Sequence, residues 1–175
     1  MRFIGCKHQA VALLAAIVLA IVLQVRPAAA EDPDLLSFSG GYYDIYHRID
    51  PAAEGSIEYR NSRRFWIFKT FGGLMANSDY TGYAYAGVLI DLYFGQHIVL
   101  TPSFAPGLWL KGHGKDLGYP LEFRSQIELA WRFADHSRIA ISYSHMSNGG
   151  LGDRNPGVET AALSYIVPFN KLFGP

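Results

Sequence analysis

Cysteine, basic charge and metal-ligand clusters are all scarce in this sequence. The single cysteine among 175 residues is Cys6, so no disulfide can form within the chain. Three of the 15 Lys and Arg residues lie in the first 30 positions, which leaves 12 against 15 acidic residues and a net charge of about −3. This balance provides no basic surface for nucleic acid, and the histidines lack the spacing of metal ligands. We therefore expect no nucleic-acid partner, no metal and no other cofactor.

Long apolar runs are missing after residue 30, which excludes a conventional transmembrane helix from that part of the chain. The apolar run over 10–25 follows a basic start and precedes the small residues Ala28–Ala30. This pattern is typical of a secretory signal peptide. A retained anchor is the alternative, but the run is short for a spanning helix, which needs about 20 apolar residues. We expect 1–30 to be a cleaved signal peptide and 31–175 to be one exported domain.

Aromatic residues, glycine and alternating polarity are abundant instead. All 11 Tyr and all 3 Trp lie after residue 30. Segments of alternating apolar and polar residues, separated by turn signals, predict β-strands. Eight such segments follow one another, at 35–47, 54–62, 64–76, 83–94, 97–112, 121–133, 137–147 and 158–169. The connections after the second, fourth and sixth are short and the others are longer, which is the pattern of a small outer-membrane barrel.

Two of these segments separate an apolar face from a polar one. In 137–147 the odd positions are mainly apolar and the even positions are small and mostly polar, and 121–133 repeats the division with four charged even positions. A membrane barrel places the apolar face outside, whereas a lipocalin-like soluble barrel places it inside. The signal peptide, the aromatic residues and the long strands favour the membrane class. The predicted fold is all-β: an eight-stranded antiparallel transmembrane β-barrel in the outer membrane of a Gram-negative bacterium.

Three polar residues interrupt the apolar face near one long loop. His145 and Ser147 occupy odd positions of one predicted strand, and Glu159 occupies an odd position of the next. If 148–156 forms the loop, His145 lies opposite Glu159, with Ser147 on the same outer face. A serine, a histidine base and an orienting carboxylate form the arrangement of a nucleophilic hydrolase site. Three polar residues at a barrel rim that merely face the interface are the alternative.

These residues carry a resemblance to a known family. His145, Ser147 and Asn148, then Asn155-Pro156-Gly157 and Glu159, resemble the lipid A 3-O-deacylases of the PagL type over about fifteen residues. The resemblance implies an outer-membrane esterase that hydrolyses the 3-O-linked acyl chain of lipid A in lipopolysaccharide. It assigns the base to His145, the nucleophile to Ser147 and the orienting acid to Glu159. Asn148 and Asn155 match loop positions that shape the site, and either is a candidate for the oxyanion hole.

Two other functions remain open at this point. A non-catalytic barrel for structure or adhesion, similar to OmpX-like proteins, would have no need of His, Ser and Glu on one outer patch. A soluble periplasmic lipid carrier would need its apolar face inside. Outer-membrane lipids and lipid A are the expected partners, and a homodimer is left open by the sequence.

Overall fold

The computed structural model describes residues 32–46 and 48–174. The predicted signal peptide, 1–30, lies outside this part of the chain. Nine strand segments and one short helix are found in the described part, in the following order. They are β1 (Leu35–Tyr43), β2 (Ala52–Phe65), β3 (Phe68–Asn77), β4 (Gly82–Leu89), β5 (Leu92–Phe94), β6 (Ile98–Leu110), β7 (Leu121–Arg132), β8 (Arg138–Ser147), β9 (Val158–Pro168) and α2 (Phe169–Phe173).

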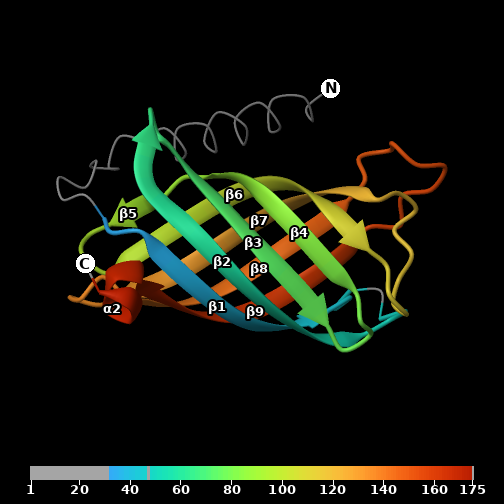
Figure 1. The fold of residues 1–175 in the computed structure, drawn as a ribbon, viewed down its shortest axis with the longest axis horizontal. Coiled ribbons are helices and arrows are strands. Elements are labelled where there is room, and N and C mark those ends of the chain that lie inside the picture. Colours follow the sequence, from blue (N-terminus) through green and yellow to red (C-terminus); the bar gives the residue numbers. More distant parts are fainter. Residues whose placement is uncertain (1–31, 47, 175) are drawn as a thin grey trace, which may run out of the picture.

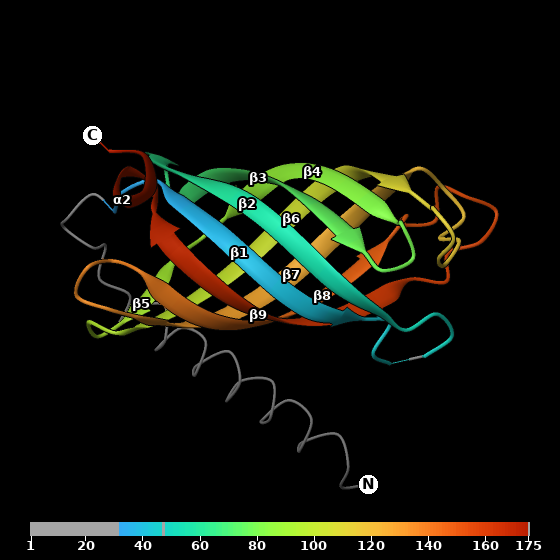
Figure 2. The same ribbon diagram turned by 60° about the horizontal axis from the view of Figure 1, so that its bottom comes forward.

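The strands form one closed antiparallel barrel, as predicted (Figure 1). Apart from β4 and β5, strands that are neighbours in sequence pair with each other, β1 pairs with β9, and β4 pairs with β6 to complete the circle. The segments β4 and β5 pair with the same partner, β6, on either side of Ile90 and Asp91. They are therefore one interrupted strand, and the barrel has eight strands. Figure 2 shows the strands inclined to the long axis of the molecule.

One predicted turn is wrong. The polar stretch at 61–63 predicts a turn between the expected strands 54–62 and 64–76, but β2 continues through it to Phe65. The register between β2 and β3 shifts between Arg60 and Arg64, so the polar stretch is a bulge within the strand. The chain reverses at Trp66 and Ile67 instead, where Trp66 takes a positive φ of 59°.

Both ends of the predicted strand pattern also differ in the structure. The first strand ends at Tyr43 rather than at residue 47, because Asp44 adopts a positive φ of 57° and begins a turn. The last predicted strand, 158–169, is confirmed as β9, which ends at Pro168, and the short helix α2 follows it. Neither difference changes the number of strands in the barrel.

The predicted inward and outward faces are confirmed. In β8 the odd residues from Ile139 to His145 are exposed on the barrel exterior, while Arg138, Ala140, Ser144 and Met146 are buried. The buried charges of Glu58, Arg60 and Glu128 are paired inside the barrel, whereas both carboxylate oxygens of the buried Glu122 lack a hydrogen-bond partner among the described residues. Arg60 donates two hydrogen bonds of 2.8 Å to the carboxylate of Glu128. Such pairing is what a small barrel needs, since an unpaired buried charge is strongly destabilising.

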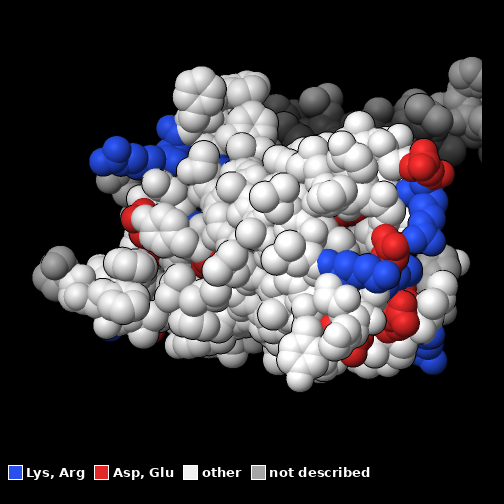
Figure 3. Space-filling view, turned by 45° about the vertical axis from the view of Figure 1, so that its right-hand side comes forward, with Lys and Arg blue, Asp and Glu red and all other residues white. Residues whose placement is uncertain are grey.

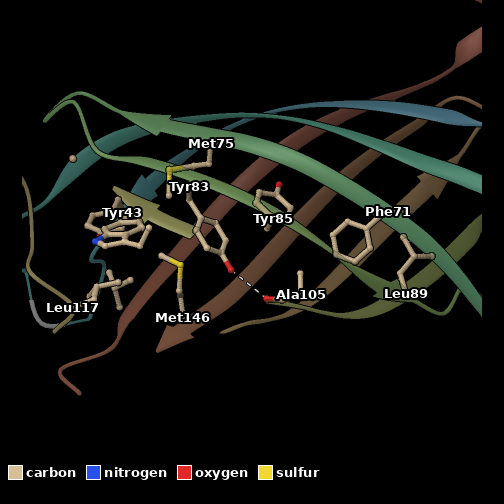
Figure 4. Close-up of a cluster of buried hydrophobic side chains, with 12 residues drawn as sticks. Tyr43, Phe71, Met75, Tyr83, Tyr85, Leu89, Ala105, Leu117 and Met146 are labelled. Carbon is tan, nitrogen blue, oxygen red and sulfur yellow. Dashed lines mark hydrogen bonds between the residues drawn. The ribbon is translucent and has the colours of Figure 1, made fainter. Parts of the chain in front are cut away.

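The interior toward the longer loops contains an apolar and aromatic cluster. Tyr43 stacks on Trp109 with ring centroids 6.0 Å apart, and Tyr83 stacks on Tyr85 at 5.0 Å. Figure 4 shows this cluster inside the strands, with the Tyr83 hydroxyl donating to the carbonyl of Ala105 at 3.2 Å. The cluster fills the barrel beneath the loops, so a rigid packed interior supports the strand ends there.

The exterior carries a belt of exposed apolar side chains. It includes Leu129, Trp131, Ile141, Tyr143, Leu163 and Tyr165, each at least 46% exposed. In Figure 3 the charged side chains on the visible face gather mainly toward the two ends, with a broad uncharged band between them. A continuous belt of this extent far exceeds the apolar patches of soluble monomers and is typical of a membrane barrel. In the described residues no helix has the length and apolar character needed to cross a membrane.

Candidate active site

His145 and Glu159 are brought together by the pairing of β8 with β9. The two residues are direct partners in the register, as the sequence predicted. The imidazole Nδ1 and the carboxylate Oε1 of Glu159 are 3.0 Å apart, within hydrogen-bond distance. The side chain of His145 is 48% exposed, whereas that of Glu159 is 12% exposed. The carboxylate thus holds one ring nitrogen, and nearly half of the His145 side chain remains exposed on the barrel exterior.

Ser147 lies two residues beyond His145, at the end of β8. It is half-buried and pairs across the sheet with Phe123 of β7. The structure contains no hydrogen bond between the Ser147 hydroxyl and His145. In hydrolases such contacts are often long without substrate and shorten when it binds. The structure therefore joins two of the three predicted residues directly and places the third on the same face.

Gly157 lies against the imidazole and was not assigned a role from the sequence. Its φ of +62° is in the left-handed region, and a Cβ there would lie 2.9 Å from Cε1 of His145. No other residue type fits without displacing the ring or straining the backbone. The signal that could have identified it is its position directly before β9, next to the register pair Met146 and Val158 and close to His145 and Glu159.

Asn148 organises the loop between β8 and β9 from a fully buried position. Its side-chain nitrogen donates to the carbonyls of Leu117 and Arg154, both at 2.8 Å, and its oxygen accepts from the Gly150 N–H. Its backbone N–H donates to the side-chain oxygen of Asn155 at 3.0 Å. Both side-chain N–H donors of Asn148 are thus occupied, so its carboxamide is not available to an oxyanion.

The loop between β8 and β9, next to the candidate site, forms an ion pair with a neighbouring loop. Arg154 forms an ion pair with Asp116 in the loop between β6 and β7. In the same loop, the Lys115 ammonium lies 2.8 Å from Asp44 and is almost fully buried. Burial acts to raise the pKa of Asp44, but hydrogen bonds from Lys115 and from two backbone N–H groups leave that pKa below its usual range. The two ion pairs therefore connect the β1–β2, β6–β7 and β8–β9 loops to one another.

An open apolar groove runs along the exterior of the barrel on the strands that carry His145 and Glu159. It has a volume of about 470 Å³. Its lining comes from β7, β8 and β9: Ile127, Leu129, Ile141, Ser142, Tyr143, Ala161, Ala162 and Leu163. Tyr143 and Ala161 are the next outward residues after His145 and Glu159, so the groove begins beside the paired side chains. The small side chains of the two alanines leave room for a narrow apolar ligand.

The described residues contain no group of three or more His, Asp or Glu side chains arranged to hold a metal ion. The fold and site together define a small outer-membrane β-barrel with a histidine–carboxylate pair on its outer surface at the rim.

Comparison with known proteins names the family. The sequence model of the family described as lipid A 3-O-deacylase (PagL) matches residues 41–168, and the chain belongs to this family. The lipid A deacylase PagL of Bordetella bronchiseptica (strain ATCC BAA-588 / NCTC 13252 / RB50) is 34% identical over 80 residues. That alignment covers 46% of this chain and 40% of the relative, so the chain spans well under two thirds of the relative's length.

The fold has also been solved in a related protein. The crystal structure of the outer membrane enzyme PagL superimposes with a TM-score of 0.60 and 17% sequence identity, covering 77% of this chain and 99% of that one. At this identity the likeness concerns the fold. It agrees with the closed eight-stranded barrel described above.

Proposed function

We propose that the protein is an esterase of the outer membrane that hydrolyses the 3-O-linked acyl chain of lipid A. The observation that carries the proposal is the 3.0 Å contact between His145 and Glu159 on the exterior of the barrel, beside Ser147. The match to the lipid A 3-O-deacylase family includes all three residues. The relative from Bordetella is itself named a lipid A deacylase, which supports the choice of substrate.

In the proposed reaction, the Ser147 hydroxyl attacks the carbonyl carbon of the ester while His145 Nε2 accepts its proton. Glu159 holds Nδ1, which orients the ring and stabilises the imidazolium. The imidazolium then gives the proton to the departing sugar oxygen, leaving an acyl group on Ser147. A water molecule, deprotonated by His145, attacks this acyl-enzyme and releases the fatty acid, and the proton returns to Ser147.

The groove on β7, β8 and β9 supports an acyl substrate. An acyl chain that lies between Tyr143 and Ala161 would place its ester near Ser147, while the sugar would remain at the rim. Because both lipid and site occupy the membrane, the substrate need not leave the bilayer. For the oxyanion we assign the side-chain nitrogen of Asn155, since its oxygen is the atom that binds the Asn148 N–H.

Ser147→Ala tests this proposal. Purified barrel is incubated with lipid A, and the release of 3-hydroxy fatty acid is measured by mass spectrometry. We expect the rate to fall at least about a thousandfold, as for nucleophiles of comparable triads. Ser144→Ala is the matched control, because Ser144 lies on the same strand but is buried in the interior.

A heat-modifiable band shift on a gel reports that each variant has folded. A folded Ser147→Ala protein that keeps more than about a tenth of the wild-type rate would exclude Ser147 as the nucleophile. Lack of any release by the wild-type protein would instead favour a non-catalytic barrel.

A further inference from the structure

The hairpin of β2 and β3 carries an exposed basic and aromatic tip at the end of the barrel opposite His145. The tip projects where β2 ends in Figure 1. Arg63 and Arg64 are both exposed, and Phe65 and Trp66 are 84% and 80% exposed. Exposed aromatic rings of this kind cover no part of the barrel interior, and they are available to a membrane or a ligand.

Among the described residues, the guanidinium groups of Arg63 and Arg64 form no ion pair or hydrogen bond. Asp34 interacts electrostatically with Arg63 but forms no ion pair with it. The two carboxylate oxygens of Asp34 instead accept hydrogen bonds from the Tyr59 hydroxyl and the Ser62 N–H. Two neighbouring guanidinium groups are thus available to an anion, and guanidinium binds phosphate oxygens through paired hydrogen bonds.

An open groove of about 540 Å³ begins at these arginines. Its lining is Asn61, Arg63, Arg64, Phe65, Phe68, Thr70 and Val88. Thr70 and Val88 are partners across β3 and β4 and lie on the outer face of the barrel. The groove therefore has cations at its end and apolar side chains along the membrane-facing wall.

The position of this groove identifies the lipid it would meet. The short connections, including the turn at Trp66, lie at this end of the barrel, and the longer loops lie at the end of the candidate active site. In outer-membrane barrels the short turns face the periplasm. The membrane leaflet on that side consists of glycerophospholipids, whose phosphate diester carries a negative charge above two acyl chains.

We propose that this hairpin is a binding site for one glycerophospholipid of the periplasmic leaflet. Arg63 and Arg64 bind the phosphate diester, and one acyl chain lies in the groove against Phe68, Thr70 and Val88. Trp66 lies at the headgroup level, where tryptophan is enriched in membrane proteins. The site is independent of the proposed hydrolysis, because it lies at the other end of the barrel and uses none of the same residues.

Native mass spectrometry of the purified barrel tests the site. The protein in detergent is titrated with dioleoylphosphatidylglycerol, and the fraction that carries one lipid is measured. We expect the double variant R63Q/R64Q to bind at least about tenfold more weakly, because two charged hydrogen-bond donors are lost. Dioleoylglycerol, which has the same chains but no phosphate, should bind the wild-type protein as weakly as the phospholipid binds the variant.

Two further variants keep the result interpretable. K111Q/K171Q removes the same charge from exposed lysines that do not line the groove, and it should bind the phospholipid as the wild-type protein does. T70W fills the groove and leaves both arginines in place, and it should also weaken binding. Equal binding by R63Q/R64Q and wild type, or equal weakening by K111Q/K171Q, would overturn the proposal. So would binding of dioleoylglycerol as strong as that of the phospholipid.

Discussion

Gly157→Ala should inactivate the proposed enzyme through His145 while the barrel remains folded. The new methyl group would lie 2.9 Å from Cε1 of the imidazole, whereas ordinary contacts begin at 3.4 Å. The ring must therefore move by about 0.5 Å or more, away from its position beside Glu159. A misplacement of about 1 Å in a catalytic group can cost roughly 100-fold in rate. We expect the turnover number for fatty acid release to fall roughly 10- to 100-fold.

Gly150→Ala is the matched control for this prediction. Gly150 lies in the same loop with a φ of +83°, but nothing lies within 4 Å of its added Cβ. Both variants carry the cost of a left-handed alanine, about 1–2 kcal/mol, and only Gly157→Ala meets the imidazole. Steady-state release of 3-hydroxy fatty acid is measured for both, together with the thermal unfolding midpoint. Full activity in Gly157→Ala, or an equal loss in Gly150→Ala, would refute the reasoning.

Three further outcomes follow from the structure. Glu159→Gln should lower the turnover number by at least about tenfold and leave the heat-modifiable shift unchanged, because the amide no longer stabilises a charged imidazolium; an unchanged rate would contradict the triad. Ala161→Trp should fill the groove beside Glu159 and raise KM for lipid A with little change in the unfolding midpoint. Lys115→Met leaves the Asp44 carboxylate buried without its cation and should cost about 3–5 kcal/mol of stability, detected as faster proteolysis of the outer loops. Because the folded pKa of Asp44 is lowered, the stability from this pair is complete above the unfolded value of about 4. This stability should be lost as pH falls through the folded pKa of Asp44. A thermal unfolding midpoint that does not change on acidification would argue against this prediction.

The sequence predicted the barrel from local patterns. Alternation with period two depends on the side-chain geometry of a strand alone, so the exposed Ile141 and the buried Ala140 could be assigned without neighbours. The same periodicity, counted back from a loop, placed His145 opposite Glu159. Residues that face each other across one hairpin are close in sequence, and a short loop fixes their register.

The failures have a common physical origin. Polar residues at 61–63 have the composition of a turn, yet Arg60 and Arg64 on either side pair with β3 and keep them in the strand as a bulge, and the chain reverses at Trp66. Cross-strand hydrogen bonds overrode the local preference of those residues. The apolar cluster around Tyr43 and Trp109 was also unpredicted, because it forms from strands that are distant in sequence.

The sequence by itself determined the strand number, the two faces and the candidate residues of the site, because each depends on local periodicity or on one hairpin. Only the tertiary structure decided what those residues contact. The bond of Asn148 to Leu117 joins two different loops, and the contact of Gly157 with the imidazole depends on the backbone angle of one residue. The first contact arises only when the folded barrel brings the two loops together, and the second depends on backbone geometry that a pattern along the chain does not contain.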